Sequence, residues 1–456
     1  MALPLTDRTR FLTGLQQCPM KRYLQFHAGP YGYGFQKRCT QIPLATGTYV
    51  HGALAEILKA VQASGKAPTK TALRLILSIQ LARYKREIEA AAFSGVPPEG
   101  LQAVVDEQFS LVKGLVWAWV RVVLPTVIEE FEVIAVEEEY VLVMGCTCGL
   151  GTAESDSKRH GEFCTGVRQM LRPDFVLRSR AEGTLSVHDF KTTAYLNDQW
   201  IEEYRQSVQM AVGTVGVEQR LREPVETYYI HPLIKGQRKN DYDAETKEYS
   251  GPKRQNSVLC YLYYRMANPP LYGEDFQPKW KFTGEDGKGH TLGRAYQKVP
   301  VWEAVFPGKP TDQDNIEFWV NTLLPEYVLQ EMFALIGPYQ RNRAMIRQYM
   351  DSMPAEEGRW NTLLWELYDE EVKHGWGSDE FQTALNVAIP RSYDCYQYGN
   401  RCQFYDICIE RKDQTWKDPI ASGRYLPRRP HHQLELEEML ARGIPVPEAE
   451  EVEEVA

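Results

Sequence analysis

Apolar residues recur at helical spacing through the first third of the chain. The clearest run lies between Tyr49 and Val61, where positions 49, 50, 53, 54, 57, 58 and 61 are apolar. Thr46-Gly-Thr48 precedes this run and predicts the cap of a helix that carries His51 and Glu56. Two further helices, each with one buried face, are predicted at about 71–92 and 101–130.

The pattern then changes to short apolar runs that are typical of strands. Strands are predicted at 131–143, within 172–191, at 225–234 and at 258–265, with a helix at about 198–219. Helices and strands in this order favour a mixed α/β fold, in which helices flank a central mixed sheet.

The stretch 172–191 reads as a hairpin that turns at Glu182-Gly183. Because side chains alternate along a strand, Asp189 and Lys191 project from the same face. A two-residue turn places Asp174 opposite Lys191 and diagonal to Asp189. Two carboxylates and an ammonium group are therefore expected at one end of an apolar hairpin.

Such a group suggests chemistry. Two neighbouring carboxylates repel each other, and a divalent cation is the usual remedy. A lysine beside the cation can stabilise or deprotonate an attacking water, which suits phosphodiester hydrolysis. The alternative is an exposed hairpin with ordinary surface charges, because Asp-x-Lys pairs are common.

Composition sets the wider frame. The chain has 456 residues, of which 43% are hydrophobic, and a net charge of −9. Residues 431–456 hold eight Glu and one Arg, a net of −7, which leaves −2 for the rest. A near-neutral body can carry a basic groove for nucleic acid, and the acidic tail is expected to be solvated and disordered.

Neither a membrane span nor a signal peptide is expected. The most apolar run, 115–124, is short and is broken by Arg121. The first residues lack a basic start, an apolar run and a small-residue cleavage site, so a cytoplasmic protein is expected. The organisation predicted from these patterns has five parts: an N-terminal segment 1–45, a core 46–235, an insertion 236–311, a helical region 312–425 and the tail 426–456.

The cysteines indicate metal or cluster binding rather than disulfides in a cytosolic chain. Cys395, Cys402 and Cys408 have a C-x6-C-x5-C spacing, and Cys18 is the natural candidate for a fourth ligand. Four thiolates also suit zinc, so zinc remains an alternative. A C-x-C pair and an H-x3-C pair could form a second zinc site; the residues are Cys146, Cys148, His160 and Cys164. The alternative is that these cysteines are ordinary thiols on a hairpin.

With one cysteine before the core and three after it, the chain resembles the iron–sulfur nucleases of the PD-(D/E)XK superfamily. These include AddB-type and CRISPR-adaptation exonucleases and related phage proteins. The motifs follow in the family's order, over roughly residues 8–235 and 385–410. They are Gly47-x-x-x-His51, Arg172-Pro-Asp174, Asp189-Phe-Lys191, and a glutamine, Gln206 or Gln209, on the next helix.

The resemblance implies a restriction-endonuclease-like core and a helical C-terminal region closed by a 4Fe-4S cluster on Cys18, Cys395, Cys402 and Cys408. It implies that His51, Asp174 and Asp189, with the backbone carbonyl of Phe190, bind Mg²⁺ or Mn²⁺. Lys191 is then expected to position and activate the water. Gln206 or Gln209 is expected to orient Lys191 or the DNA backbone.

The function that these features imply is that of a metal-dependent DNA exonuclease, acting on single strands or DNA ends. Recombination, repair or phage DNA processing is the expected setting, with a recombinase or helicase as a further partner. Two alternatives stay open: an inactive nucleic-acid-binding or scaffold subunit of the same fold, and a zinc-stabilised protein without nuclease activity. Basic residues near the cysteines could line a path for single-stranded DNA; they are Lys21, Arg22, Lys37, Arg38, Arg391 and Arg401. The default interpretation is that these are scattered surface charges.

Overall fold

A mixed sheet of five strands organises the computed structural model, in the order β15-β10-β9-β8-β5. Strands β9 and β10 are parallel, and the other neighbouring pairs are antiparallel. The strands are β5 (Phe131–Val136), β8 (Phe175–Ser179), β9 (Leu185–Thr193), β10 (Thr227–Ile234) and β15 (Ile336–Gln340). The structure describes residues 5–443 apart from gaps, the longest of which are 94–100, 146–165, 236–240, 251–279, 284–288 and 293–315.

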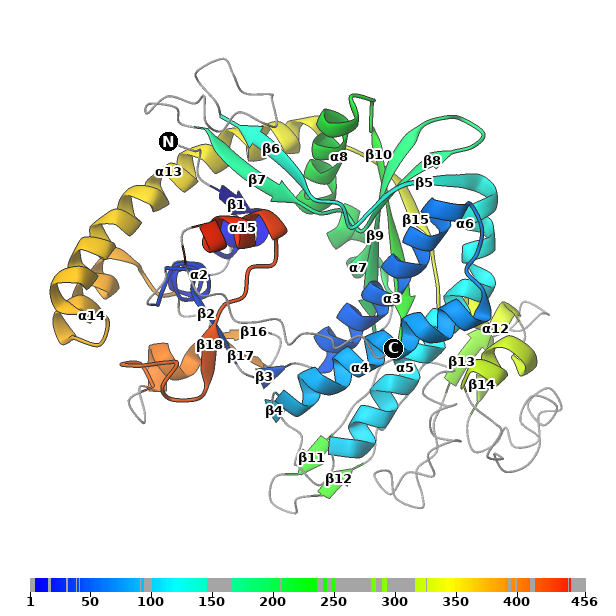
Figure 1. The fold of residues 1–456 in the computed structure, drawn as a ribbon, viewed down its shortest axis with the longest axis horizontal. Coiled ribbons are helices and arrows are strands. Elements are labelled where there is room, and N and C mark those ends of the chain that lie inside the picture. Colours follow the sequence, from blue (N-terminus) through cyan, green and yellow to red (C-terminus); the bar gives the residue numbers. More distant parts are fainter. Residues whose placement is uncertain are drawn as a thin grey trace.

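Helices cover one face of this sheet (Figure 1). They are α3 (Ile42–Ser64), α4 (Lys70–Ala90), α5 (Leu101–Val122) and α6 (Leu124–Glu130). The apolar positions predicted for the first of them, such as Val50, Leu54 and Leu58, are fully buried against the sheet. Apolar spacing along the helix thus correctly predicted its buried face.

The opposite face packs against a second sheet and three helices. That sheet has the order β1-β7-β6, with β1 (Leu5–Asp7) parallel to β7 (Val167–Leu171) and β6 (Tyr140–Met144) antiparallel to it. The helices are α7 (Asp198–Arg205), α8 (Val208–Leu221) and the first half of α13 (Arg343–His374). Together they bury a second apolar cluster.

A third apolar cluster joins the two ends of the chain. It contains α2 (Pro19–Phe26), the second half of α13, α14 (Asp379–Ala388) and η6 (Asp406–Glu410). Strand β2 (Phe35–Lys37) pairs with β18 (Tyr425–Pro427) at its side. Within it Arg22 is fully buried, donates to Glu357 at 2.8 Å and lies 4.3 Å from the ring centre of Trp360. Arg22 is therefore a structural residue, and its expected place on a DNA path is wrong.

Part of the acidic tail is folded. Residues 433–441 form α15 (Gln433–Ala441), shown in red beside the N-terminal elements in Figure 1. The buried Glu435 accepts hydrogen bonds from Arg10 at 2.6 Å and from Arg428. A buried carboxylate with two guanidinium partners holds this helix in place, so the disorder expected from composition does not extend over these residues.

The remaining elements are short. Those of the first half are α1 (Arg8–Leu12), β3 (Cys39–Thr40), β4 (Ala92–Phe93), β11 (Asp241–Asp243), β12 (Glu248–Ser250), β13 (Trp280–Thr283) and β14 (Gly289–Leu292). Those of the second half are α11 (Ile316–Phe318), η5 (Trp319–Leu323), α12 (Glu326–Gln330), β16 (Tyr396–Gln397) and β17 (Asn400–Arg401). The strand predicted at 258–265 lies outside the described residues.

Several predicted boundaries are wrong. Thr46-Gly-Thr48 lies inside α3 rather than capping it. The predicted helix 101–130 is two helices, because Pro125 lacks the N–H that would continue the first one. The helix after Lys191 is also divided, since α8 begins anew after Ser207, whose backbone is extended.

One segment resembles a membrane span by length and composition alone. Residues Gln108–Glu130 form the single such candidate in the part of the chain that the structure describes. In its most apolar window, 56% is buried inside the protein, and Trp117 and Trp119 belong to the first apolar cluster. A core helix has these properties, so the segment is weak evidence for a membrane.

Candidate active site

The two motif aspartates lie side by side at one end of the central hairpin. Phe175 pairs with His188, and the same register carried one residue further sets Asp174 opposite Asp189. The prediction that Asp174 faces Lys191 is therefore wrong by two positions. The turn is wider than two residues, because Ser179 N–H donates to Thr184 O at 2.9 Å and Gly183 has a φ of +70°.

Burial perturbs both carboxylates, and repulsion adds to this effect at Asp189. Asp189 is 2% exposed, and burial together with Asp174 raises its pKa to about 6. Burial also raises the pKa of Asp174, while Lys191, the Phe190 N–H and Arg172 oppose the rise. The backbone N–H of Phe190 donates to Asp174 Oδ2 at 2.6 Å, which fixes that carboxylate.

His51 approaches the pair from α3. Its Nδ1 lies 3.8 Å from Asp174 Oδ2, and burial followed by the charge of Lys191 lowers its pKa to about 4. Gly47, one turn earlier, allows this approach: a Cβ there would lie 2.6 Å from Thr192 Oγ1 of β9. The G-x-x-x-H spacing thus serves close packing of helix on strand, which brings the imidazole to the aspartates.

Two buried atoms in this group lack a hydrogen-bond partner among the described residues. They are Nε2 of His51 and Oδ2 of Asp189. Lys191 Nζ contacts that Asp189 oxygen as an ion pair, but without hydrogen-bond geometry. Burial lowers the pKa of Lys191, and Asp189 and Asp174 outweigh it to give a net rise, so its amine is an ammonium at neutral pH.

The structure describes one of the two candidate glutamines of the glutamine motif. Gln209 lies in the first turn of α8 and lines a cavity together with Asp189. Gln206 falls outside the described residues, as do Cys146, Cys148, His160 and Cys164 of the possible second zinc site. Gln209 therefore lines the same cavity as Asp189.

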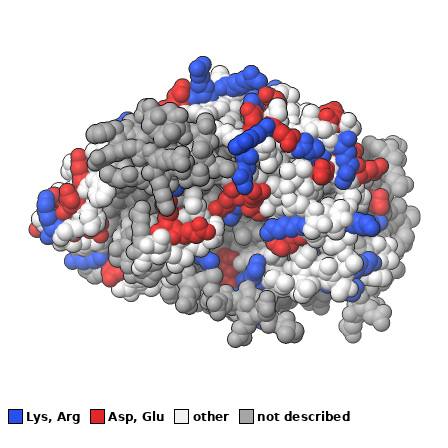
Figure 2. Space-filling view, turned by 45° about the horizontal axis from the view of Figure 1, so that its top comes forward, with Lys and Arg blue, Asp and Glu red and all other residues white. Residues whose placement is uncertain are grey.

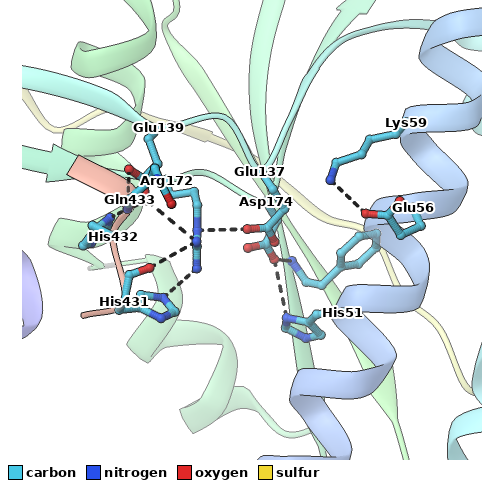
Figure 3. Close-up of polar contacts among 11 residues, drawn as sticks. His51, Glu56, Lys59, Glu137, Glu139, Arg172, Asp174, His431, His432 and Gln433 are labelled. Atoms are coloured by element: carbon cyan, nitrogen blue, oxygen red, sulfur yellow. Dashed lines mark hydrogen bonds and ion pairs between the residues drawn. The ribbon is translucent and has the colours of Figure 1, made fainter. Parts of the chain in front are cut away.

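Glu137 and Arg172 complete the site, and sequence reasoning gave them no role of their own (Figure 3). Arg172 Nε lies 3.0 Å from Glu137 Oε2, and Glu137 N–H donates to Asp174 O at 2.9 Å. Burial and the neighbouring Asp174 raise the pKa of Glu137 to about 7. Its φ of 51° is in the left-handed region, which a non-glycine residue adopts at a cost of about 1 kcal/mol or more.

The chain's C-terminal part reaches the same place. His431 Nε2 lies 2.7 Å from Arg172 Nη2, and Glu139 accepts the backbone N–H of Gln433 at 2.9 Å. In Figure 3, Arg172 stands between His431 on one side and Glu137 and Asp174 on the other. Glu56 lies apart from this group and pairs with Lys59 at 2.8 Å. Only the run Glu137-Glu138-Glu139 after a strand hints at these contacts in the sequence.

The cysteines from the two ends of the chain lie in the same lobe. Cys18, Cys402 and Cys408 pack against the third apolar cluster, and Cys402 N–H donates to Cys395 O at 2.8 Å. Burial raises the pKa of Cys408 to about 12; Arg391 opposes this rise and the other three thiols add to it. All three thiols are therefore within electrostatic reach of Cys408. No disulfide joins these four cysteines.

Neither set forms a closed metal site as it stands. Among the described residues, no group of three or more His, Cys, Asp or Glu side chains is arranged to hold a metal ion. At the aspartates, Asp189 is paired with Lys191. Acidic and basic side chains stand together around a hollow on the face shown in Figure 2, rather than as a patch of one charge.

Comparison with known proteins agrees with this geometry. The PD-(D/E)XK nuclease superfamily matches residues 11–281, more than half of the chain. The chain therefore belongs to this superfamily, and its mixed α/β architecture is consistent with a restriction-endonuclease-like fold. Membership implies a nuclease that cleaves phosphodiester bonds, with DNA as the implied substrate and Mg²⁺ or Mn²⁺ as the usual cation. No curated protein matches the chain.

Proposed function

We propose that this nuclease is a metal-dependent DNA exonuclease, acting on single strands or DNA ends. The observation that carries the proposal is the position of Asp174 opposite Asp189, with His51 and Lys191 against the pair. Isolated surface charges do not explain a buried carboxylate beside a second, partly buried one. Burial raises the pKa of both, and the charge of Asp174 adds to the rise at Asp189, a cost that a bound cation relieves.

The donor atoms fit a divalent cation. Asp189 Oδ2 and His51 Nε2 are buried without hydrogen-bond partners, and Asp174 lies between those two residues. Carboxylate oxygens and a neutral imidazole suit Mg²⁺ or Mn²⁺, and the low pKa of His51 keeps its ring neutral. The carbonyl of Phe190 is the proposed fourth ligand. The cation supplies Lewis-acid stabilisation of the phosphate and a more acidic bound water.

The protein groups around this place have separate tasks. Lys191 stays protonated and donates hydrogen bonds, so it orients the attacking water and offsets charge that develops on the phosphate. The Phe190 N–H holds Asp174 in one orientation. Gln209 faces the same cavity and is the described glutamine that can orient Lys191 or the DNA backbone; Gln206 keeps the same proposed role.

We further propose that Cys18, Cys395, Cys402 and Cys408 hold a structural 4Fe-4S cluster. Thiolates are the ligands of such clusters, and these four meet in one lobe from opposite ends of the chain. A cluster binds each thiolate through a different iron, so its thiols stand farther apart than those around one zinc ion.

The proposed setting is recombination, repair or phage DNA processing in the cytoplasm of a prokaryotic cell or a phage-infected host. A recombinase or helicase is a proposed partner. The active site requires a strand that can reach a recessed pair of carboxylates. Single strands and frayed ends meet that condition more easily than an intact duplex.

End-labelled single- and double-stranded DNA, incubated with Mg²⁺ or Mn²⁺, tests the activity, and circular DNA separates exonuclease from endonuclease cleavage. We expect linear DNA to be degraded from an end and circular DNA to survive. Asp189→Asn should remove the activity, whereas Asp198→Asn, at the start of α7, should keep it. Equal degradation by wild type and Asp189→Asn would place the chemistry elsewhere.

A further inference from the structure

A cavity of about 140 Å³ opens beside Asp189. Residues from five parts of the chain line it: β1 and α1, the β7–β8 segment, β9, α8, and the segment at His431 and His432. The lining includes Asp189 and Gln209 but not Asp174, His51 or Lys191. The cavity is thus adjacent to the proposed cation position and separate from it.

Almost every charged group in the lining has a partner. Asp7 accepts the N–H of Arg10 at 2.8 Å, and Arg172 pairs with Glu137 at 3.0 Å. Asp189 contacts Lys191, and His432 lies 3.2 Å from Glu139. Burial, with Arg172 nearby, lowers the pKa of His431 to about 4, so this ring is neutral at pH 7.

Arg8 is the exception. Among the described residues its guanidinium makes no hydrogen bond and no ion pair, although the side chain is half-buried. Burial lowers its pKa, while Tyr349 and then Asp189 act in the opposite direction, which sets Arg8 close to both. Arginine remains charged at any ordinary pH. Pairing of β1 with β7 and the start of α1 hold this unpaired cation at the cavity.

We infer that Arg8 is a phosphate-binding residue for the DNA strand and that this cavity receives the phosphodiester next to the one that is cut. A recessed guanidinium without a partner is costly, and phosphate is the anion that its planar fork binds best. Gln209 also lines the cavity and supplies an amide. The inference rests on the proposed function, because it assumes that DNA lies at Asp189.

The position of Arg8 distinguishes its role from that of Lys191. Lys191 contacts Asp189 and serves the phosphate at the cation, whereas Arg8 lines the cavity, which Lys191 does not. A neighbouring phosphate held at Arg8 fixes the register of the strand relative to the cation. Arg8 is therefore a positioning residue, and its loss should weaken DNA binding even where no chemistry takes place.

The test uses Asp189→Asn protein, which binds without cutting, and a fluorescent single-stranded oligonucleotide followed by anisotropy at several KCl concentrations. Adding Arg8→Gln should weaken binding about tenfold. It should also reduce the slope of log affinity against log salt by about 0.7, the value for one lost phosphate contact on a single strand. Arg8→Lys should restore the slope but only part of the affinity.

Arg74→Gln is the matched control, because α4 covers the opposite face of the sheet and Arg74 pairs there with Glu317. It should leave affinity and slope unchanged. A second measurement does not depend on how Arg8→Gln folds. A set of oligonucleotides is used in which an uncharged methylphosphonate linkage replaces one phosphodiester, at a different position in each. In protein that retains Arg8, the replacement should weaken binding about tenfold at one position.

Three outcomes would overturn the inference. The Arg8→Gln variant folds and binds DNA with the affinity and salt slope of its parent, or no position of the methylphosphonate linkage weakens binding. The third outcome is that the Asp189→Asn protein does not bind DNA. Failure of the proposed function looks different. In that case the Arg8 effects appear, but wild-type protein does not degrade DNA with either cation. The phosphate site would then stand on a DNA-binding protein without nuclease activity.

Discussion

The aspartate site and the cysteine lobe are built in opposite ways, although each is proposed to hold an inorganic group. The aspartates lie on adjacent strands of the central sheet, and hydrogen-bonded register fixes their separation. The cysteines lie on the shortest elements of the chain: the residue before α2, the two ends of the β16–β17 hairpin, and η6. The fold sets the geometry of the aspartate site, whereas the geometry of the cysteine site depends on the group that its thiolates bind.

The difference extends to what surrounds each site. Asp189 and Asp174 have charged neighbours, among them Lys191 on β9 and Arg172 before β8, and their pKa values are raised. The thiols are half-exposed and rest on an apolar cluster. The lobe has other attachments, such as the buried pair Arg22–Glu357 and the β2–β18 pairing. We therefore expect losses at the aspartates to affect chemistry first and losses at the cysteines to affect stability first.

The largest expected effect concerns the aspartates. Asp174→Asn or Asp189→Asn should lower DNA hydrolysis by about 10³-fold or more, because each removes a proposed cation ligand. The iron content and the melting temperature should not fall. Steady-state degradation assays and iron analysis on the same samples measure both. An aspartate variant that lost iron together with activity would contradict the independence of the two sites.

The next effect concerns the cysteines. Cys408→Ser should abolish iron binding and destabilise the lobe by about 3 kcal/mol or more, because ligand binding contributes to folding. Hydrogen exchange should show faster exchange in α14 and η6 and little change in β8 and β9. Cys39→Ser, outside the proposed ligand set, is the control. Stoichiometric zinc in place of iron in anaerobically purified protein would favour the zinc alternative.

The third effect is a pH dependence of stability in the absence of divalent cations. The folded-state pKa of Asp189, about 6, lies above its ordinary value of 3.8, so the folded state holds this proton more tightly than the unfolded state does. The resulting stability is present below pH 4 and is lost as the pH rises through 6, at most about 3 kcal/mol.

Urea unfolding between pH 4 and 7 measures this loss as the difference between wild type and Asp189→Asn. Mg²⁺ should restore stability to wild type at pH 7 and not to the variant. A difference that stays constant across this range, or one that grows in the opposite direction, contradicts the assignment of a strained carboxylate pair.

The smallest effect concerns the folded part of the tail. Glu139 caps α15 from another part of the chain, accepting the N–H groups of Gln433 and Leu434. Glu139→Ala should therefore weaken the docking of α15 by about 1 kcal/mol. Faster hydrogen exchange at those two amides measures it. Glu138→Ala is the neighbouring control, and an equal effect there would rule out a specific cap.

The sequence predicted what local pattern determines. Apolar spacing located the buried face of α3, and motif order located the aspartates, His51 and the lysine. Hairpin register was missed, because it depends on the Ser179–Thr184 hydrogen bonds of a wider turn. Strand β15 was missed because Ile336–Gln340 contains Gly and Pro between helical stretches, and it forms only by pairing with β10.

The rest of the site arises from contacts between distant segments. Nothing near Arg8 in the sequence indicates that β1 pairs with β7 and sets this side chain beside Asp189. Composition suggested a disordered tail, yet Glu435 is buried between Arg10 and Arg428. Glu137, with its unusual backbone angle, contacts Asp174 O and Arg172 in the β7–β8 connection. Such pairings are visible only once the chain is folded.

The most direct test of the account is Mn²⁺ binding followed by electron paramagnetic resonance, because Mn²⁺ reports its own ligands. We predict one tightly bound Mn²⁺ with a coupled histidine nitrogen. The nitrogen coupling should disappear in His51→Ala, and the binding itself should be lost in Asp174→Asn and Asp189→Asn. Mn²⁺ that binds equally well to all three variants, or without any nitrogen coupling in wild type, would contradict the claim that these residues surround a single cation.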